Sequence, residues 1–241
     1  MADQGSFRQH ISGQFNAELE AATAHLLEMG GVVRRQVLAA VEAFLERDSG
    51  DAQAVIDEDS SINAMEITID DECFRILARR QPTAGDLRLV LAISKSVPDL
   101  ERIGDEASRI ARQAIARSEI AESDLVQASV AAVSRSVTDM LGEALDAFAR
   151  RDPEAALAVA RGDQAIDADV GAAMTALTDA MRADRSSVDS AMVAMWVLRS
   201  LERVASHARN IAEHVIYIVE GVDVRHAELD RVLEWLPERQ P

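Results

Sequence analysis

A stretch in the middle of the chain returns in altered form about a hundred residues later. Residues 100–105 read Leu-Glu-Arg-Ile-Gly-Asp, and residues 201–206, displaced by 101 positions, read Leu-Glu-Arg-Val-Ala-Ser. A second pair of anchors, Asp-x-x-Ile-Asn at 59–63 and Asp-x-x-Ile-Asp at 163–167, is displaced by 104 positions. Two anchors in the same order at nearly the same spacing indicate an internal duplication. The fold is therefore restricted to architectures built from two related halves.

Helical periodicity runs through both halves. Apolar residues recur at spacings of three, four and seven, and no stretch alternates as a strand would. Hydrophobic residues make up 48% of the chain but aromatic residues only 3%, which favours closely packed helices over sheets. The sequence therefore predicts an all-α protein of two tandem, pseudo-symmetric, antiparallel three-helix bundles. The expected helices lie at about 15–46, 50–80, 84–117, 124–150, 153–182 and 188–220, with domains 1–120 and 121–222 and a tail 223–241 that holds a short helix at 225–234.

The charge balance limits the classes of partner. Forty-two acidic residues face 25 basic ones, giving a formal charge of −17. Such a surface repels nucleic-acid phosphates and anionic membranes, and it suits cations or a basic patch on another protein. The single Cys73 excludes an intramolecular disulfide and suits a reducing compartment. With no signal-like or membrane-spanning segment in view, we expect a soluble cytoplasmic protein that binds no nucleic acid.

Acidic side chains from neighbouring helices are expected to face each other in each half. The helices on either side of the short turn at 81–83 must be antiparallel neighbours, and the same holds for the turn near 184–187. Carboxylate and carboxamide oxygens are ligands for Mg²⁺, Mn²⁺ or Ca²⁺, and carboxylates also hold Fe³⁺ or Zn²⁺. A solvated acidic face explains the same spacing and remains the alternative. The residues concerned are Asp59, Asn63, Glu66, Glu101 and Asp105 in the first half, and Asp163, Asp167, Glu202, Ser206 and Asn210 in the second.

No residue pattern typical of an enzyme is present. None of the five histidines has a Glu three positions before it, as a di-iron bundle would require. Ser206 and His207 are adjacent and so point to different faces of a helix, which excludes a nucleophile–base pair. No glycine-rich phosphate loop is found. We predict that the chain is not an enzyme; a metal buffer or metal-dependent enzyme, or a purely structural scaffold, are the alternatives.

Three stretches of the chain are distinctive: 79–88 (RRQPTAGDLR), 99–105 (DLERIGD), and 201–203 (LER) with 210–213 (NIAE). Together they resemble the PhoU family, the regulatory accessory proteins of the phosphate-specific transport system. The resemblance extends from about residue 15 to 221 and implies two symmetry-related three-helix bundles. It also implies a non-enzymatic negative regulator of the phosphate-starvation response. Such a protein links the ATP-binding subunit of a phosphate ABC transporter to a membrane sensor histidine kinase, and reaches the membrane only through these partners.

The resemblance also implies a metal site in each bundle. The family's Glu-x-x-x-Asp-x-x-x-Asn pattern departs here at Arg109 and Ser206, and Asn63 stands where the family favours Asp. We therefore expect one weakly held Mg²⁺-like ion, or none, in each half, rather than multinuclear iron or zinc. The ligands carried over are Asp59, Glu101, Asp105, Asp163, Asp167, Glu202 and Asn210.

Three arginines are candidate contacts for the partner proteins. They are Arg88, Arg102 and Arg203, and solvated helix charges are the alternative interpretation. The sequence does not decide between a monomer and a homodimer that forms through an apolar patch.

Overall fold

The computed structural model describes residues 4–117, 119–121 and 123–225, with side chains from residue 13 onward. The described residues form six long helices and one short 3-10 turn, and no strand. This confirms the all-α prediction; the helix expected at 225–234 lies almost wholly outside the described residues. The helices are α1 (Gln4–Glu46), α2 (Ser49–Arg80), α3 (Ala84–Arg117), α4 (Asp124–Arg150), α5 (Pro153–Ala183) and α6 (Val188–Glu220), with η1 (Arg185–Ser187) before α6.

Local chemistry sets the helix boundaries. Asp152 caps α5 as its sequence predicts, because its carboxylate accepts hydrogen bonds from the backbone N–H groups of the first turn, and Pro153 takes the first helical position. The cap of α2 is one residue earlier than expected: Asp48, and not Ser49 or Asp51, accepts from the first backbone N–H groups. Gly221 ends α6 with φ of 74°.

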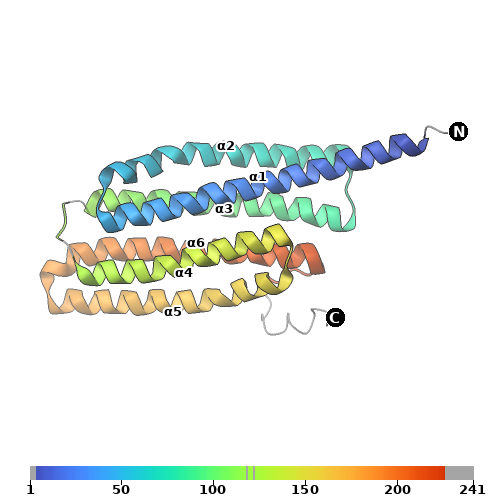
Figure 1. Ribbon diagram of the computed structural model, residues 1–241. Helices are drawn as coiled ribbons and strands as arrows, with labels where there is room; N and C mark the ends of the chain where they lie inside the picture. Colours follow the sequence, from blue (N-terminus) through green and yellow to red (C-terminus); the bar gives the residue numbers. More distant parts are fainter. Residues whose placement is uncertain (1–3, 118, 122, 226–241) are drawn as a thin grey trace.

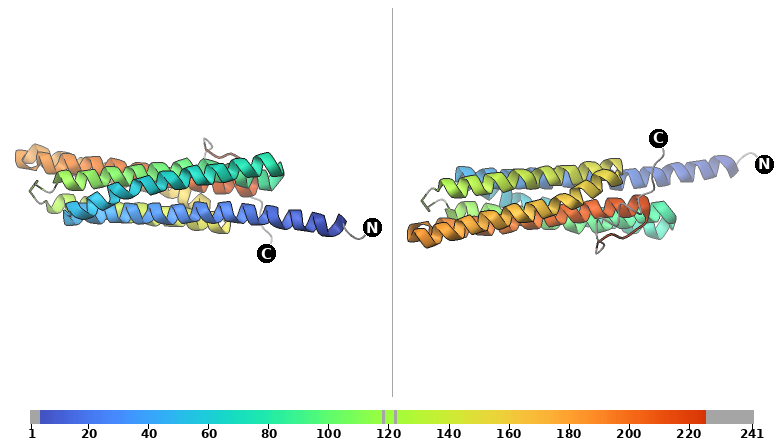
Figure 2. Two further views of the ribbon diagram at one scale, coloured as in Figure 1. Left: turned by 90° about the horizontal axis from the view of Figure 1, so that it is seen from above. Right: turned by 90° about the horizontal axis from the view of Figure 1, so that it is seen from below.

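The six helices form two three-helix bundles that lie side by side along their lengths (Figure 1). The bundle of α1–α3 meets the bundle of α4–α6 through α3 against α6 and α1 against α4. Within the described residues, α2 and α5 pack only on helices of their own bundle, except that α5 also meets η1. The two views of Figure 2 show the same pairing and the N-terminal end of α1 projecting beyond the other helices. The pseudo-symmetric fold read from the duplication is confirmed.

The contact between the bundles is a continuation of the core. Buried apolar side chains from all six helices form one continuous cluster. Gly30 of α1 faces Leu145 of α4, and a Cβ at Gly30 would collide with the Leu145 side chain. A glycine therefore permits the close approach of α1 and α4. No described helix carries an apolar stretch long enough to cross a bilayer.

Candidate functional site

Carboxylates of the first bundle lie near one another on α2 and α3, and we call this set of residues the first acidic groove (Asp59, Glu66 and Asp70 of α2; Glu101 and Asp105 of α3). Burial raises the pKa of Glu101, and the charges of Asp105, Glu66 and Asp59 raise it further. Burial likewise raises the pKa of Glu66, with Asp70 and Asp105 adding to the effect. The predicted facing of these helices therefore brings Asp59, Glu101 and Asp105 into one electrostatic cluster. Asn63, by contrast, is exposed.

Asp59 is bound within this groove by a neutral partner. Its Oδ1 accepts a hydrogen bond of 3.1 Å from the hydroxyl of Ser108, a buried residue of α3. At the other end of the groove the Ser94 hydroxyl donates to Asp70. Hydroxyl groups satisfy oxygen lone pairs without cancelling their charge. The first acidic groove thus keeps its negative charge, apart from Arg109, which lies 3.8 Å from Asp105.

The second bundle places the equivalent acids between α5 and α6, in what we call the second acidic groove (Asp163 and Asp167 of α5; Glu202 of α6). Here a guanidinium enters: Arg209 donates to Asp163 Oδ2 at 3.2 Å and to Glu213 Oε1 at 2.9 Å. Both carboxylates are buried, with 4% and 3% of their surface exposed. Glu202 is paired with Arg199 at 2.6 Å. The charges of this groove are largely compensated from within the bundle.

Burial still outweighs the guanidinium at Asp163. It raises the pKa of this carboxyl, an effect that the hydrogen bond from Arg209 reduces and the charge of Asp167 reinforces. Asp163 Oδ1 is buried and has no hydrogen-bond partner among the described residues. Ser206, where the family favours Asp, donates to the backbone carbonyl of Glu202 on its own helix.

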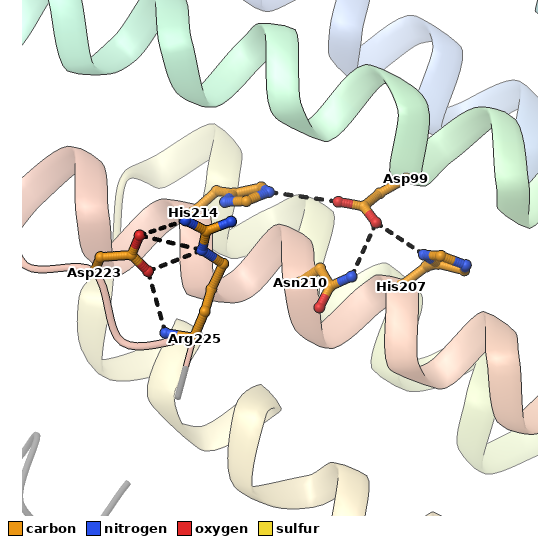
Figure 3. Close-up of polar contacts among 6 residues, drawn as sticks. All are labelled: Asp99, His207, Asn210, His214, Asp223 and Arg225. Carbon is orange, nitrogen blue, oxygen red and sulfur yellow. Dashed lines mark hydrogen bonds and ion pairs between the residues drawn. The ribbon is translucent and has the colours of Figure 1, made fainter. Parts of the chain in front are cut away.

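A third group of polar residues joins the two bundles (Figure 3). Asp99 of α3 is 7% exposed and accepts hydrogen bonds from His207 Nδ1 at 2.8 Å and Asn210 Nδ2 at 3.0 Å, while His214 Nε2 lies 3.4 Å from its other oxygen. Burial alone would raise the pKa of Asp99, but the three α6 side chains lower it to about 2. Asn210, a predicted metal ligand, thus binds an acid of the opposite bundle.

The predicted partner contacts are distributed along the junction of α3 and α6. Arg88 donates through Nε to the carbonyl of Ile218, 3.1 Å away, and so connects the two helices. Arg102 and Arg203 are exposed, and Arg203 also pairs at 3.1 Å with the buried Glu106. Arg88 lies near the start of α3 and its partner Ile218 lies near the end of α6, so these two helices run antiparallel.

Among the described residues, no group of three His, Cys, Asp or Glu side chains could hold a metal ion. The first acidic groove nevertheless offers the carboxylate oxygens that a hard cation prefers, and neighbouring carboxylates add to the effect of burial in raising the pKa of Glu66 and Glu101. The second acidic groove fits one less well, because Arg209 occupies the carboxylate that would be its ligand.

Comparisons with known proteins agree with this geometry. A sequence model described as "PhoU domain" matches residues 26–114 and 130–215, one stretch in each bundle. The chain is 52% identical to the phosphate-specific transport system accessory protein PhoU homolog of Pseudomonas aeruginosa, over 97% of each chain. It is 41% identical to the phosphate-specific transport system accessory protein PhoU of Escherichia coli K12, over 96% of this chain and 97% of the relative. The chain belongs to the PhoU family.

Solved structures of PhoU proteins share the fold. The crystal structure of PhoU from Pseudomonas aeruginosa, 52% identical, matches with a TM-score of 0.83 over 86% of this chain and all of the other. The phosphate transport system regulatory protein PhoU from Streptococcus pneumoniae, 27% identical, matches with a TM-score of 0.80 over 87% of this chain and 99% of the other. The family resemblance drawn from the sequence is confirmed.

Sequence reasoning missed six residues that organise these sites. Arg209 and Glu213 are four positions apart on one helix, a spacing that signals an ion pair and could have been found. Asp99 stands at the head of the repeated stretch and His207 and His214 are a heptad apart, but only the packing of α3 on α6 joins them. Glu106 and Arg109 are three positions apart on α3, so their pair could also have been found, but the second partner of Glu106, Arg203, lies 97 positions away.

Proposed function

We propose that this protein regulates phosphate homeostasis from the cytoplasm, by binding other proteins rather than by catalysis. It couples the ATP-binding subunit of a phosphate ABC transporter to a sensor histidine kinase, and it represses starvation signalling while phosphate is plentiful. One observation carries this proposal: relatives 52% and 41% identical over nearly the whole chain are phosphate-specific transport system accessory proteins. Such proteins act through surfaces, and this fold supplies long rigid helical ones.

Two features of the surface support a protein-binding role. Arg102 and Arg203 lie on the solvent side of the α3–α6 junction, where a partner can reach them. On the flank of α6, Trp196 is 60% exposed and Met192 is 44% exposed. Arginine and tryptophan are enriched among the residues that dominate binding energy at protein interfaces. Arg88 is a weaker candidate, because its bond to Ile218 already gives it a structural role.

We propose that a cation binds in the first bundle only. Burial and neighbouring carboxylates raise the pKa of Glu66 and Glu101, which supports a cation there, whereas Arg209 already supplies a positive charge in the second bundle. We infer that a weakly held Mg²⁺-like ion, where one binds, lies against Glu101, Asp105 and Asp59. The ion would stabilise the α2–α3 pair and take no part in chemistry.

The test is a pull-down with the purified chain as bait. The prey are the ATP-binding subunit of the cognate phosphate transporter and the cytoplasmic part of the sensor kinase, each with and without excess inorganic phosphate. We expect both to bind and the kinase to bind in a phosphate-dependent way. Arg102→Ala with Arg203→Ala should weaken capture, while Arg185→Ala, an exposed arginine in the η1 turn, serves as the matched control.

Three results would overturn the proposal. Capture of neither prey would favour a structural scaffold. Phosphate-independent capture of both would remove the regulatory part. Turnover of phosphoester substrates, abolished by Glu101→Gln, would favour a metal-dependent enzyme. Light scattering on the same samples gives the oligomeric state.

A further inference from the structure

A pocket lies where the two halves of the molecule meet around their pseudo-two-fold axis. Arg102 and Arg203 occupy equivalent positions in the duplication, 101 residues apart, and both line this pocket. Its volume is about 320 Å³, ample for a small ion with bridging water. The lining residues are Arg102, Asp105, Glu106 and Arg109 of α3, with Arg203 and His207 of α6.

The pocket lining has the opposite charge to the protein as a whole. Three guanidinium groups face two carboxylates, a surplus of positive charge before His207 is counted, in a chain of formal charge −17. The groove between α4 and α5 shows the opposite, with Asp139, Glu143 and Asp169 in its lining and no arginine or lysine. Clustered arginines in an otherwise acidic surface focus an attractive potential on small anions.

Two of the guanidinium groups are held in place before any ligand arrives. Glu106, 3% exposed, accepts hydrogen bonds from Nη1 of Arg109 and, at 3.1 Å, from Nη1 of Arg203 on the opposite bundle. Each guanidinium has five N–H donors, so several remain for a ligand. Holding these long side chains in advance lowers the entropy cost of binding. Arg102, within the described part of the chain, makes no hydrogen bond or ion pair and can turn to a ligand.

Asp99 fixes a further donor at the edge of the pocket. It binds Nδ1 of His207 at 2.8 Å, which leaves Nε2 to meet a ligand (Figure 3). Nε2 accepts from a proton-bearing ligand when the ring is neutral, and it donates to a ligand oxygen when the ring is an imidazolium.

Glu106 also offers a way to distinguish between anions. Its Oε2 is buried and has no hydrogen-bond partner among the described residues. At neutral pH inorganic phosphate carries at least one proton and can donate to such an oxygen, whereas sulfate is fully ionised and can only be repelled by it. An unpaired buried acceptor penalises the ligand that lacks the donor.

We propose that this pocket binds a protonated tetrahedral oxyanion, with inorganic phosphate preferred over sulfate. Arg102, Arg109, Arg203 and His207 hold the oxygens, and Glu106 accepts the proton-bearing one. That phosphate is the physiological ion rests on the proposed function; the preference itself rests only on the lining. Bound phosphate would occupy the same arginines that a partner protein is proposed to contact, so the isolated chain would sense phosphate directly.

The experiment is isothermal titration of the full chain with sodium phosphate and with sodium sulfate at matched ionic strength. We expect phosphate to bind more tightly than sulfate. Arg102→Ala with Arg203→Ala should weaken phosphate binding by at least about tenfold, since hydrogen bonds to charged groups contribute on that scale. Arg185→Ala should leave it unchanged. Because the double variant also releases Glu106, Arg102→Ala alone is the second variant: Arg102 makes no such bond, so its loss leaves the fold intact.

Glu106→Gln tests the basis of selectivity. An amide at this position can donate to sulfate, so the ratio of phosphate to sulfate affinity should fall. Absence of phosphate binding by the wild type, equal affinity in the arginine variants, or an unchanged ratio in Glu106→Gln would each overturn the proposal. Phosphate-dependent capture of the kinase that persists in Arg102→Ala would leave the proposed function standing and remove the pocket as its sensor.

Discussion

An acid at equivalent positions of the two bundles is bound by chemically different partners. In the first, Asp59 of α2 accepts a hydrogen bond from the Ser108 hydroxyl of α3; in the second, Asp163 of α5 accepts one from the Arg209 guanidinium of α6. Both members of each pair are related by the duplication, at displacements of 104 and 101 positions. The scaffold is therefore shared, while the charge that meets the buried acid is not.

This difference teaches that duplicated helices can keep a packing register while the partner of a buried acid changes. In the first acidic groove, burial and neighbouring carboxylates raise the pKa of Glu66 and Glu101, so we expect a cation to be favoured there. The second acidic groove contains its own cation in Arg209 and has less to gain from another. Substitutions at equivalent positions of the two copies break or sharpen this comparison.

The largest effect is expected at Arg209. Arg209→Ala leaves Asp163 and Glu213 buried without a positive partner, which should lower the free energy of unfolding by about 3–5 kcal/mol. The equivalent change in the first bundle, Ser108→Ala, removes one hydrogen bond from an uncharged donor and should cost about 1 kcal/mol. Urea denaturation of both variants measures the difference. Equal losses would show that the two grooves are equivalent after all, and Asp163→Asn should restore part of the stability lost in Arg209→Ala.

The next effect concerns Asp99 of α3, whose duplicated position on α6 is Ser200. An acid whose pKa is lowered on folding adds stability above its unfolded pKa, and that stability is lost as the pH falls through the folded pKa of about 2. A shift from 3.8 to about 2 corresponds to about 2 kcal/mol. Asp99→Asn should therefore be less stable at pH 7 and lack this loss between about pH 4 and pH 2.

Denaturant unfolding of Asp99→Asn and wild type across that pH range provides the measurement. Ser200→Ala changes the duplicated position on α6 and is the control, with little expected effect. A wild-type pH profile that the Asn variant reproduces would mean that His207, Asn210 and His214 do not stabilise the ionised carboxylate.

A smaller effect is expected where the copies differ by a single methyl group. Gly104 packs on Ile62, and an added Cβ would approach its Cδ1 to 2.9 Å, whereas the duplicated position is Ala205. Ala205→Gly should cost about 1 kcal/mol through lost helix propensity. Gly104→Ala should be nearly neutral, because the gain in propensity offsets the displacement of the Ile62 side chain. Thermal unfolding of both variants measures these two effects, and a melting temperature raised by Ala205→Gly would contradict the prediction.

The smallest effect lies in the acidic grooves. Folding raises the pKa of Glu101, so its contribution to stability falls as the pH rises from its unfolded value of 4.5 through the folded one. Glu101→Gln should stabilise the protein at pH 7 by about 0.5 kcal/mol, a value kept small by solvent screening. Glu202→Gln loses its pair with Arg199 instead and should be neutral or slightly destabilising.

Adding Mg²⁺ sharpens the same comparison. The ion should raise the melting temperature of the wild type and of Glu202→Gln by more than that of Glu101→Gln, because the unpaired carboxylates lie in the first acidic groove. A response that depends on Glu202 rather than Glu101 would reverse the assignment of the two grooves.

Much of the fold could be predicted because it is local. The apolar periodicity fixes six helices, Asp152 and Pro153 mark the start of α5, and Gly221 marks the end of α6. The facing of Glu66 and Glu101 followed from the short turn between α2 and α3, which forces antiparallel neighbours. The predicted cap of α2, at Ser49 or Asp51, was wrong because several polar residues at that turn have the same capping chemistry as Asp48.

The sequence by itself determined the helices, the duplication and the positions of the acids along each helix, because a helix repeats every 3.6 residues whatever it packs against. The tertiary structure alone decided which partner each acid meets. Asp99 finds two histidines, Glu106 finds Arg203 and Asp163 finds Arg209 only once α3, α5 and α6 adopt their rotation and register. Those partners lie 46 to 115 residues away along the chain, and no local spacing encodes them.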